Sequence, residues 1–225
     1  MARTYNPFYG PPPRGAPRIR FSLVEAQHLL LAVGALTLAF AFFFGPGDPL
    51  DFGTRIEALL RRPIYLIASL LAVSSGFILH ELAHKVVAIR YGCWAEFRAH
   101  MPGLVGGLLL AFLAKIVLAL PGAVVIRGTL TPRANGLVSI AGPATNIVVA
   151  AVCLPFTLVP DPDAAMPFVL GVMAYTNALL GVFNLLPFGR LDGRKVWWWN
   201  KAVWAVAMGV AVSLLAVSFT RTSLF

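Results

Sequence analysis

Long apolar stretches dominate the chain, and short segments rich in Gly, Pro, Asp and Arg separate them. There are five such stretches, at about residues 26 to 44, 64 to 89, 137 to 159, 167 to 186 and 196 to 219. A helix needs about 20 apolar residues to cross the hydrocarbon core of a bilayer, and each stretch is close to that length. The pattern therefore predicts an all-α polytopic membrane protein with about five transmembrane helices.

A sixth apolar segment, at about residues 103 to 126, does not fit a simple crossing. It contains Lys115 and a Pro-Gly pair, and its end at Ala123 to Ile126 has strand-like composition. A single crossing here would put the basic loops that follow on the outer side, against the positive-inside rule. Irregular backbone at membrane depth is tolerated where protein covers it. We therefore expect a re-entrant or short β segment that leaves the membrane on the side where it entered.

The composition narrows the possible partners. Hydrophobic residues make up 59% of the chain and charged residues 12%, whereas about a quarter of the residues of a soluble domain are charged. The formal net charge of +9 would suit a nucleic-acid partner in a soluble protein, but here Lys and Arg cluster beside the apolar stretches. We expect the lipid bilayer as a partner and no nucleic acid. The two cysteines, Cys93 and Cys153, do not indicate a disulfide framework, and nothing in the sequence indicates an oligomeric state.

Residues 1 to 22 are rich in Pro and Arg and contain no acidic residue, a composition that cannot bury a core. We expect a flexible, basic cytoplasmic tail there and a single membrane-embedded domain over residues 23 to 225. No small-residue cleavage site follows the first apolar stretch, so an uncleaved multi-pass protein of the cell membrane with a cytoplasmic N-terminus is expected. Basic residues of the first outer linker, Arg55, Arg61 and Arg62, argue weakly against this orientation.

A His-Glu-x-x-His motif lies near the end of the second apolar stretch. Residues at i and i+4 project from one face of a helix, so His80 and His84 can bind one Zn²⁺ while Glu81 lies beside the metal's open position. His80 lies about nine residues, or about 13 Å of helix, from the inner end of the stretch. Ionisable side chains at membrane depth are costly unless they serve a function. The motif therefore predicts a zinc protease whose active site lies inside the membrane, toward the cytoplasmic side.

Zinc in a catalytic site usually has a third protein ligand. The extended metzincin pattern is excluded, because it needs Gly and His where the chain has Val87 and Arg90. On the inner side after the motif, the candidates are Glu96, His100 and Asp192. Asp192 follows a segment with Pro and Gly, where a helix can unwind and turn the carboxylate back onto a metal. Glu96 and His100 are expected in a loop, where solvated side chains without a ligand role are more common.

Three segments carry further polar residues at fixed spacings. They are His80-Glu81-x-x-His84, Gly142-Pro143-x-x-Asn146, and residues 184 to 193 with the sequence Asn-Leu-Leu-Pro-Phe-Gly-Arg-Leu-Asp-Gly. Together, and in this order, they resemble the three signatures of site-2 proteases, a family of intramembrane zinc metalloproteases. A Pro-Gly-Ala-Val stretch at residues 121 to 124 is similar to that of archaeal members. The chain looks like a minimal archaeal-type catalytic core, without the PDZ or CBS domain that many members carry.

The resemblance implies one Zn²⁺ per chain, held by His80, His84 and Asp192, with Glu81 as the catalytic base. It also implies that Asn146 helps to hold the extended substrate or its oxyanion. The implied activity is hydrolysis of peptide bonds within or near transmembrane segments of membrane-protein substrates, as in regulated intramembrane proteolysis. Residues 23 to 225 would then be one metalloprotease domain.

Some roles stay open at this point. Asn184 has two interpretations, as a donor that orients Asp192 or as a cap for an interrupted helix. The 103 to 126 segment is a candidate edge strand for an unwound substrate. Two other functions fit the histidine pair: a metal-binding transporter or channel, which predicts metal flux without cleavage, and a catalytically silent membrane scaffold with a structural zinc. Structural zinc usually has four protein ligands, and only three are evident here, which favours catalysis.

Overall fold

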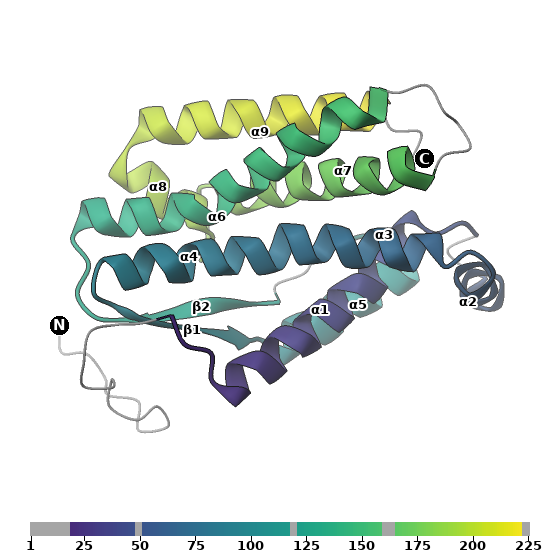
Figure 1. Ribbon diagram of the computed structural model, residues 1–225, viewed down its shortest axis with the longest axis horizontal. Helices are drawn as coiled ribbons and strands as arrows, with labels where there is room; N and C mark the ends of the chain where they lie inside the picture. The colour runs from purple at the N-terminus through teal and green to yellow at the C-terminus, as the bar shows by residue number, and fades with distance from the viewer. Residues whose placement is uncertain (1–18, 48–50, 118–120, 159–164, 222–225) are drawn as a thin grey trace.

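The computed structural model describes residues 19–47, 51–117, 121–158 and 165–221 (Figure 1). Among these residues, five helices are long and apolar enough to cross a membrane. They are α1 (Leu23–Phe44), the continuous helix formed by α3 (Ile64–Val73), η1 (Ser74–Ile78) and α4 (Leu79–Arg90), α6 (Pro132–Cys153) with its 3₁₀ extension η2 (Leu154–Leu158), α7 (Ala165–Leu185) and α9 (Lys201–Arg221). The predicted all-α polytopic fold is confirmed. Most of the expected N-terminal tail, residues 1–18, lies outside the described residues.

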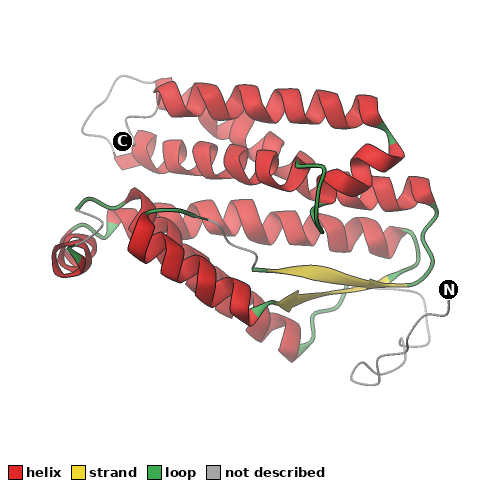
Figure 2. Cartoon of the chain, turned by 180° about the vertical axis from the view of Figure 1, so that it is seen from behind, coloured by secondary structure: helices red, strands yellow, loops and turns green. Residues whose placement is uncertain are grey.

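The continuous α3–η1–α4 helix lies in the middle of the bundle. Helices α6 and α7 pack on one side of it with α9 beyond them, and α1 and α5 (Met101–Ala114) lie on the other side together with two strands (Figures 1 and 2). The main apolar core joins α1, α3, α7 and the first strand, with Phe40, Val73, Val172 and Phe97 all buried. Because this core sits between the central helix and its neighbours, it fixes the central helix that carries the His-Glu-x-x-His motif.

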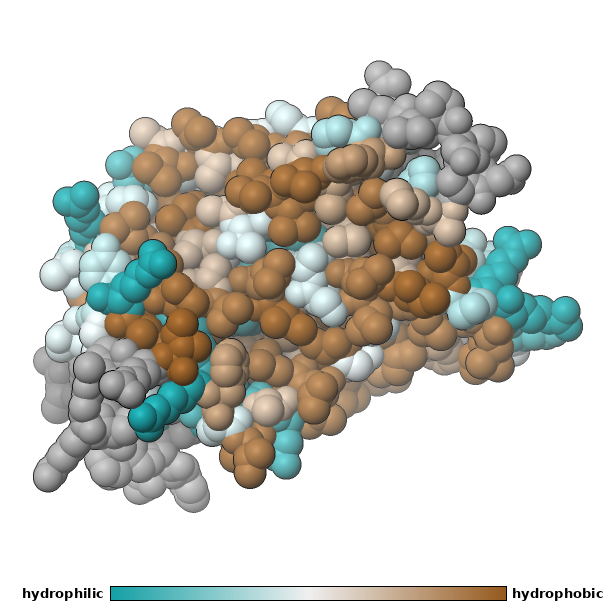
Figure 3. Space-filling view, in the orientation of Figure 1, coloured by the Kyte–Doolittle hydropathy of each residue, from teal (hydrophilic) through white to brown (hydrophobic). Residues whose placement is uncertain are grey.

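The outer surface of the bundle is apolar along its length. Leu30 of α1, Val148 of α6 and Val206 of α9 are 72%, 61% and 68% exposed. Figure 3 shows hydrophobic residues covering most of one face, with hydrophilic residues gathered toward the two ends. Apolar patches of this extent are unstable in water and suit contact with lipid.

The last span begins at Lys201 and not at about residue 196, so that predicted boundary was wrong. Residues 192–199 form the separate helix α8 (Asp192–Trp199), and Asn200 adopts an extended conformation after it. The side chain of Asn200 then accepts hydrogen bonds from the N–H groups of Ala202 and Val203, which starts a new helix. Apolar periodicity continues through this break, so the sequence pattern did not show it.

The apolar 103 to 126 segment begins at one end of the bundle, runs along it toward the other end, and finishes at the end where it began, as expected for a re-entrant segment. β1 (Trp94–Ala99) and β2 (Gly122–Arg127) pair antiparallel, with Trp94 opposite Arg127 at the outer end of the ribbon. After the Ala99 end of β1, α5 runs beside α1 toward the end of the bundle where α1 finishes, and β2 is the next element (Figure 2). His100 caps the start of α5 by accepting a hydrogen bond from the N–H of Gly103.

Arg55, from helix α2 (Phe52–Arg61), fastens the far ends of α1 and α5 to each other. Its side chain is buried and donates hydrogen bonds to the carbonyls of Phe42, Ala111 and Phe112. These carbonyls lie in the last turns of their helices, where a positive charge also interacts favourably with the helix dipole. Arg55 therefore serves packing, and its presence in this linker is weak evidence about membrane orientation.

A buried ion pair fastens the start of α1 at the opposite end. Lys85 Nζ lies 2.5 Å from Glu25 Oε2, and both side chains are almost fully buried. The other oxygen of Glu25 accepts a hydrogen bond of 3.0 Å from the N–H of Phe97 in β1. One carboxylate thus joins α1, the end of α4 and the outer edge of β1, so these three elements keep a fixed arrangement beside the histidine motif.

Candidate metal centre

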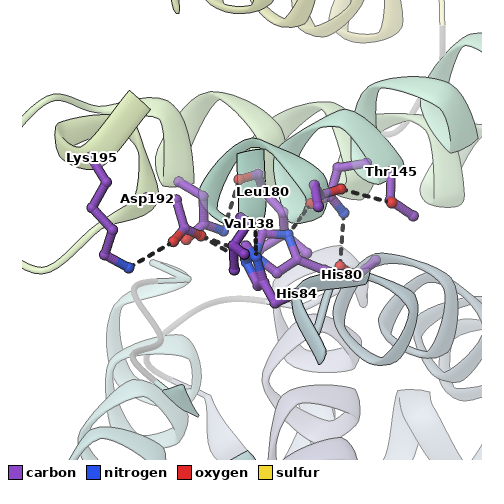
Figure 4. Close-up of polar contacts among 11 residues, drawn as sticks. His80, His84, Val138, Thr145, Leu180, Asp192 and Lys195 are labelled. Carbon is purple, nitrogen blue, oxygen red and sulfur yellow. Dashed lines mark hydrogen bonds and ion pairs between the residues drawn. The ribbon is translucent and has the colours of Figure 1, made fainter. Parts of the chain in front are cut away.

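The two motif histidines lie on the face of α4 that packs against α6. Their Nε2 atoms are 3.0 Å apart, and both residues are buried. Each Nδ1 atom faces an oxygen: that of His80 lies 2.5 Å from Asn146 Oδ1, and that of His84 lies 2.7 Å from the carbonyl oxygen of Val138 (Figure 4). An amide or carbonyl oxygen only accepts, so each Nδ1 carries the proton and each Nε2 presents its lone pair.

Asp192, the predicted third ligand, lies close to both histidines. Its Oδ2 atom lies 2.9 Å from His84 Nε2 and 3.5 Å from His80 Nε2. These three residues form a group of potential ligand atoms within 4.8 Å of one another in the described part of the chain. The other two candidates lie elsewhere, since Glu96 pairs with Arg98 and His100 caps α5.

The break between the end of α7 and the start of α8 brings Asp192 to this position. α7 ends at Leu185, Gly189 adopts a positive φ of 62° in the following turn, and α8 starts at Asp192. A Cβ on Gly193 would overlap the carbonyl of Leu185, so glycine at 193 permits α8 to pack this closely against the end of α7. The unwinding expected in this segment is present.

The cluster fits a zinc ion in three respects. A tetrahedral Zn²⁺ with bonds of about 2.0 to 2.1 Å places its ligand atoms about 3.3 Å apart. The distances between the two Nε2 atoms and Asp192 Oδ2, 2.9, 3.0 and 3.5 Å, are close to this value. A Cβ on Gly142 of α6 would lie 2.5 Å from His80 Nε2 and closer still to His84 Nε2, so this glycine leaves the space in front of the histidines open. Two imidazole nitrogens and one carboxylate oxygen are a typical catalytic zinc donor set.

Glu81 lies between the histidine pair and the β ribbon. Its carboxylate accepts a hydrogen bond from the backbone amide of Val124 in β2, whereas Oε2 is buried without a hydrogen-bond partner among the described residues. Beside it is a cavity of about 40 Å³ between α1, α4 and the ribbon, lined also by Leu29, Leu82 and Phe97. A space of that size could hold roughly three water molecules at 10 to 15 Å³ each, and Glu81 is one of the residues that line it.

Asn146 faces the cluster with its oxygen. The residue is fully buried, and its Nδ2 donates to the carbonyl of Gly76 at 2.7 Å and to Asn177 Oδ1 at 3.1 Å. Both of its N–H groups are therefore engaged in this arrangement. The expected role of Asn146 as an oxyanion donor stays a prediction, and the observed contact is with the ring of His80.

Asn184 lies on the last turn of α7. Its side chain donates a hydrogen bond of 3.0 Å to the carbonyl of Leu180, one turn earlier on the same helix. This contact stays within α7, so the role of Asn184 as a cap for the interrupted helix stays a prediction. The orientation of Asp192 by Asn184 also stays a prediction.

Sequence reasoning missed contacts that belong to the site. Lys195 Nζ lies 3.2 Å from Asp192 Oδ1, the oxygen that does not face the histidines, and its i+3 spacing on α8 was a usable signal. Asn177 was another, because an amide in the middle of an apolar span calls for a function. The carbonyl of Val138 left no signal, since backbone groups do not depend on residue type.

The fold and the cluster together define a multi-helix membrane protein with a candidate metal site, and known proteins are similar to it. No family model matches the chain, and no solved structure matches it. The chain is 36% identical over 188 residues to MJ0611 of Methanocaldococcus jannaschii, which is named "Putative zinc metalloprotease", across 83% of this chain and 91% of that protein.

Mycobacterial proteins of the same name match shorter parts. Rip3 of Mycobacterium tuberculosis is 36% identical over 138 residues, 59% of this chain and 29% of that protein. Rip2 of Mycolicibacterium smegmatis is 31% identical over 150 residues, 59% of this chain and 58% of that protein. The chain therefore belongs to the site-2 protease family of zinc metalloproteases, and zinc is its cofactor.

Gly142 gives a direct test of the metal site. Gly142→Ala is expected to weaken zinc binding at least tenfold, because the added methyl group occupies the space where the two Nε2 atoms converge. Gly209→Ala is the matched control, since that glycine also lies in a membrane-length helix but has open space beside it. Zinc affinity is measured by competition with a chelator on purified protein. Equal affinity in the two variants would contradict the placement of the metal.

Proposed function

We propose that the protein is an intramembrane zinc endopeptidase that cleaves membrane-protein substrates within or near their transmembrane segments. One observation carries the proposal: His80, His84 and Asp192 form a cluster in a bundle of membrane-length helices, near a Glu81 oxygen that has no partner among the described residues. Burying these groups in an apolar bundle is costly unless they bind a metal and carry out chemistry. Cleavage of this kind is the step that regulated intramembrane proteolysis requires.

The chemistry divides between the metal and the chain. Bound zinc supplies a Lewis acid that polarises the scissile carbonyl and lowers the pKa of water to about 7. Glu81 is the general base that accepts the proton of the attacking water and passes it to the leaving amine. His80, His84 and Asp192 hold the metal, and the backbone and amide oxygens at the two Nδ1 atoms keep both rings turned toward it.

The alternatives explain the site less well. A structural zinc in a silent scaffold usually has four protein ligands, whereas three converge here in the described part of the chain. A transporter or channel releases its metal, but here both imidazoles are held by hydrogen bonds on the side away from the metal. Metal transport also gives no role to the Glu81 carboxylate or to the cavity that it lines.

We propose that the end of the bundle where α1 begins and α4 ends faces the cytoplasm. Basic residues gather at this end, in the segments before α1 and between the spans: Arg20, Arg90, Arg127, Arg133, Arg190, Arg194, Lys195 and Lys201. Positive charge beside spans favours the cytoplasmic side. At the opposite end, Arg55 and Lys115 are used to bind carbonyls of helix ends. The N-terminus and the approach to the active site are then cytoplasmic.

The β ribbon offers the edge of β2 to a substrate. Along the edge of β1, the N–H groups of Phe97 and Ala99 already donate to Glu25 and His28 of α1. Phe97 pairs with Val124, and in an antiparallel pair whose N–H groups point outward, alternate residues do the same. Val124 and Ile126 therefore direct their N–H groups away from β1, Val124 toward Glu81. An unwound substrate segment that adds to this edge would run past the base.

The catalytic proposal is tested by comparing wild type with Glu81→Gln. Wild type is expected to cleave a model transmembrane peptide in detergent, and Glu81→Gln is expected to lose about 10² to 10⁴-fold in rate, the usual contribution of a general base. Zinc content is measured in both proteins, with chelator-treated wild type as the negative control. Equal cleavage by the two proteins, with equal zinc, would overturn the role of Glu81.

The edge-strand proposal is tested with Ile126→Pro, with Ile126→Ala as the control that keeps the N–H group. Proline removes one outward donor and is tolerated at a free strand edge. We expect at least a tenfold loss of peptide cleavage in Ile126→Pro, near wild-type cleavage in Ile126→Ala, and unchanged zinc content in both. Full cleavage by Ile126→Pro would count against strand addition.

A further inference from the structure

A row of polar side chains leads from His80 away from the metal site toward α7 and η1. It consists of Asn146 on α6, Asn177 on α7 and Ser75 in η1 (Figure 4 shows its end at His80). Both asparagines are fully buried. Polar groups at this depth are costly unless they are hydrogen-bonded, and the proposed chemistry uses the row only at the ring of His80.

The hydrogen bonds of the row all run in one direction. Ser75 has one hydroxyl proton, which points to the carbonyls of the preceding turn, 2.8 Å from Leu71 and 3.1 Å from Ala72. Its oxygen therefore accepts from Asn177 Nδ2 at 3.1 Å. The second N–H of Asn177 donates to the carbonyl of Met173 at 2.9 Å. With both protons placed, Asn177 has only its oxygen left to face Asn146.

Counting donors and acceptors in the same way fixes the orientation of the Asn146 amide. Its two N–H groups donate to Asn177 Oδ1 at 3.1 Å and to the carbonyl of Gly76 at 2.7 Å. Gly76 lies in η1, a π-helical turn, where the wider winding frees a carbonyl from the regular helical pattern. The only group that Asn146 can turn toward His80 is therefore its oxygen, at 2.5 Å from Nδ1. An oxygen there requires the proton on Nδ1 and leaves Nε2 free for the metal.

The two histidines are held in different ways, and the difference explains why His80 needs the row. His84 Nδ1 donates to the carbonyl of Val138, a backbone group that is always an acceptor. The partner of His80 is an amide side chain, which can turn over and present N–H₂ in place of oxygen. A turned amide would stabilise the opposite tautomer, with the proton on Nε2, and that tautomer does not bind zinc.

We propose that Asn177, held by Ser75, is a positioning residue that fixes the orientation of the Asn146 amide and thereby the metal-binding tautomer of His80. The proposal rests on the proposed metal site. It explains why His80 is held in the tautomer that can bind zinc. Asn177 touches neither the metal nor the substrate, and it acts through Asn146 alone. The row also ties the tautomer to the packing of α6 and α7 against η1.

The test replaces the Asn177 amide with a side chain of the same branched shape that forms no hydrogen bonds. Asn177→Leu leaves Asn146 free to turn over, and we expect about a tenfold loss of zinc affinity, at the lower end of the 10- to 100-fold range for groups that orient metal ligands. Thr176→Val is the matched control, because Thr176 is equally buried on α7 and its hydroxyl has no hydrogen-bond partner among the described residues. We expect the control to keep wild-type affinity, as measured by chelator competition.

A spectroscopic readout separates positioning from loss of packing. Nitrogen-15 NMR of histidine-labelled, zinc-free protein distinguishes a protonated Nδ1 from a protonated Nε2. We expect one His80 tautomer in wild type and Thr176→Val, and a mixture in Asn177→Leu. A single Nδ1–H form in Asn177→Leu, with zinc affinity equal to that of the control, would overturn the proposal. Failure of wild type itself to bind zinc would instead overturn the metal site on which the proposal rests.

A double variant separates orientation of the amide from other roles of Asn177, and Ser75→Ala covers the case in which Asn177→Leu does not fold. Asn146→Asp keeps an acceptor opposite His80 that cannot turn over, so adding Asn177→Leu to it is expected to cause no further loss of zinc affinity. A further tenfold loss in that double variant would show a role other than orientation. Ser75→Ala removes the acceptor that holds Asn177, and we expect a loss of severalfold in zinc affinity; unchanged affinity and tautomer would again contradict the relay.

Discussion

The cost of burying ionisable groups in an apolar bundle is the constraint on which this structure depends. The five long helices carry two acidic side chains, Glu25 and Glu81. Glu25 has partners at both oxygens, from Lys85 and the N–H of Phe97, and it serves packing. Glu81 has one oxygen without a partner in the described chain. A buried carboxylate left in that state is unfavourable for stability, and the chemistry that we propose at the neighbouring metal site would account for it.

The architecture brings the reactive groups together from separate parts of the chain. The central helix supplies both histidines, the interrupted helix after α7 supplies Asp192, and the ribbon edge lies against Glu81. Each approach depends on a small local feature: Gly142 leaves room for the metal, and Gly193 lets α8 meet the end of α7. The Glu25 and Lys85 pair and the Arg55 contacts hold α1 and the ribbon beside this centre. Rigid support from several elements is what a preorganised site requires.

Much of this arrangement could be predicted from the sequence because its signals are local. Apolar stretches of bilayer length gave the five spans, i and i+4 spacing gave the histidine pair, and a Pro and Gly segment indicated where Asp192 turns back. The remainder depends on contacts between distant segments. Nothing in the sequence shows that the carbonyl of Gly76 holds the side chain of Asn146, or that the carbonyl of Val138 holds that of His84. Any residue supplies a backbone carbonyl, so residue type gives no signal. The break at Asn200 was missed because apolar residues continue on both sides of it.

The central claim is that hydrolysis takes place inside the membrane, and mapping the cleaved bond tests it most directly. The protein and a single-span substrate are reconstituted together in liposomes with zinc, and the new termini are identified by mass spectrometry. We expect a cut within the apolar segment or at its immediate edge, and no cut when Glu81→Gln replaces wild type. Cuts confined to the soluble parts of the substrate, or cuts that persist in Glu81→Gln, would contradict it.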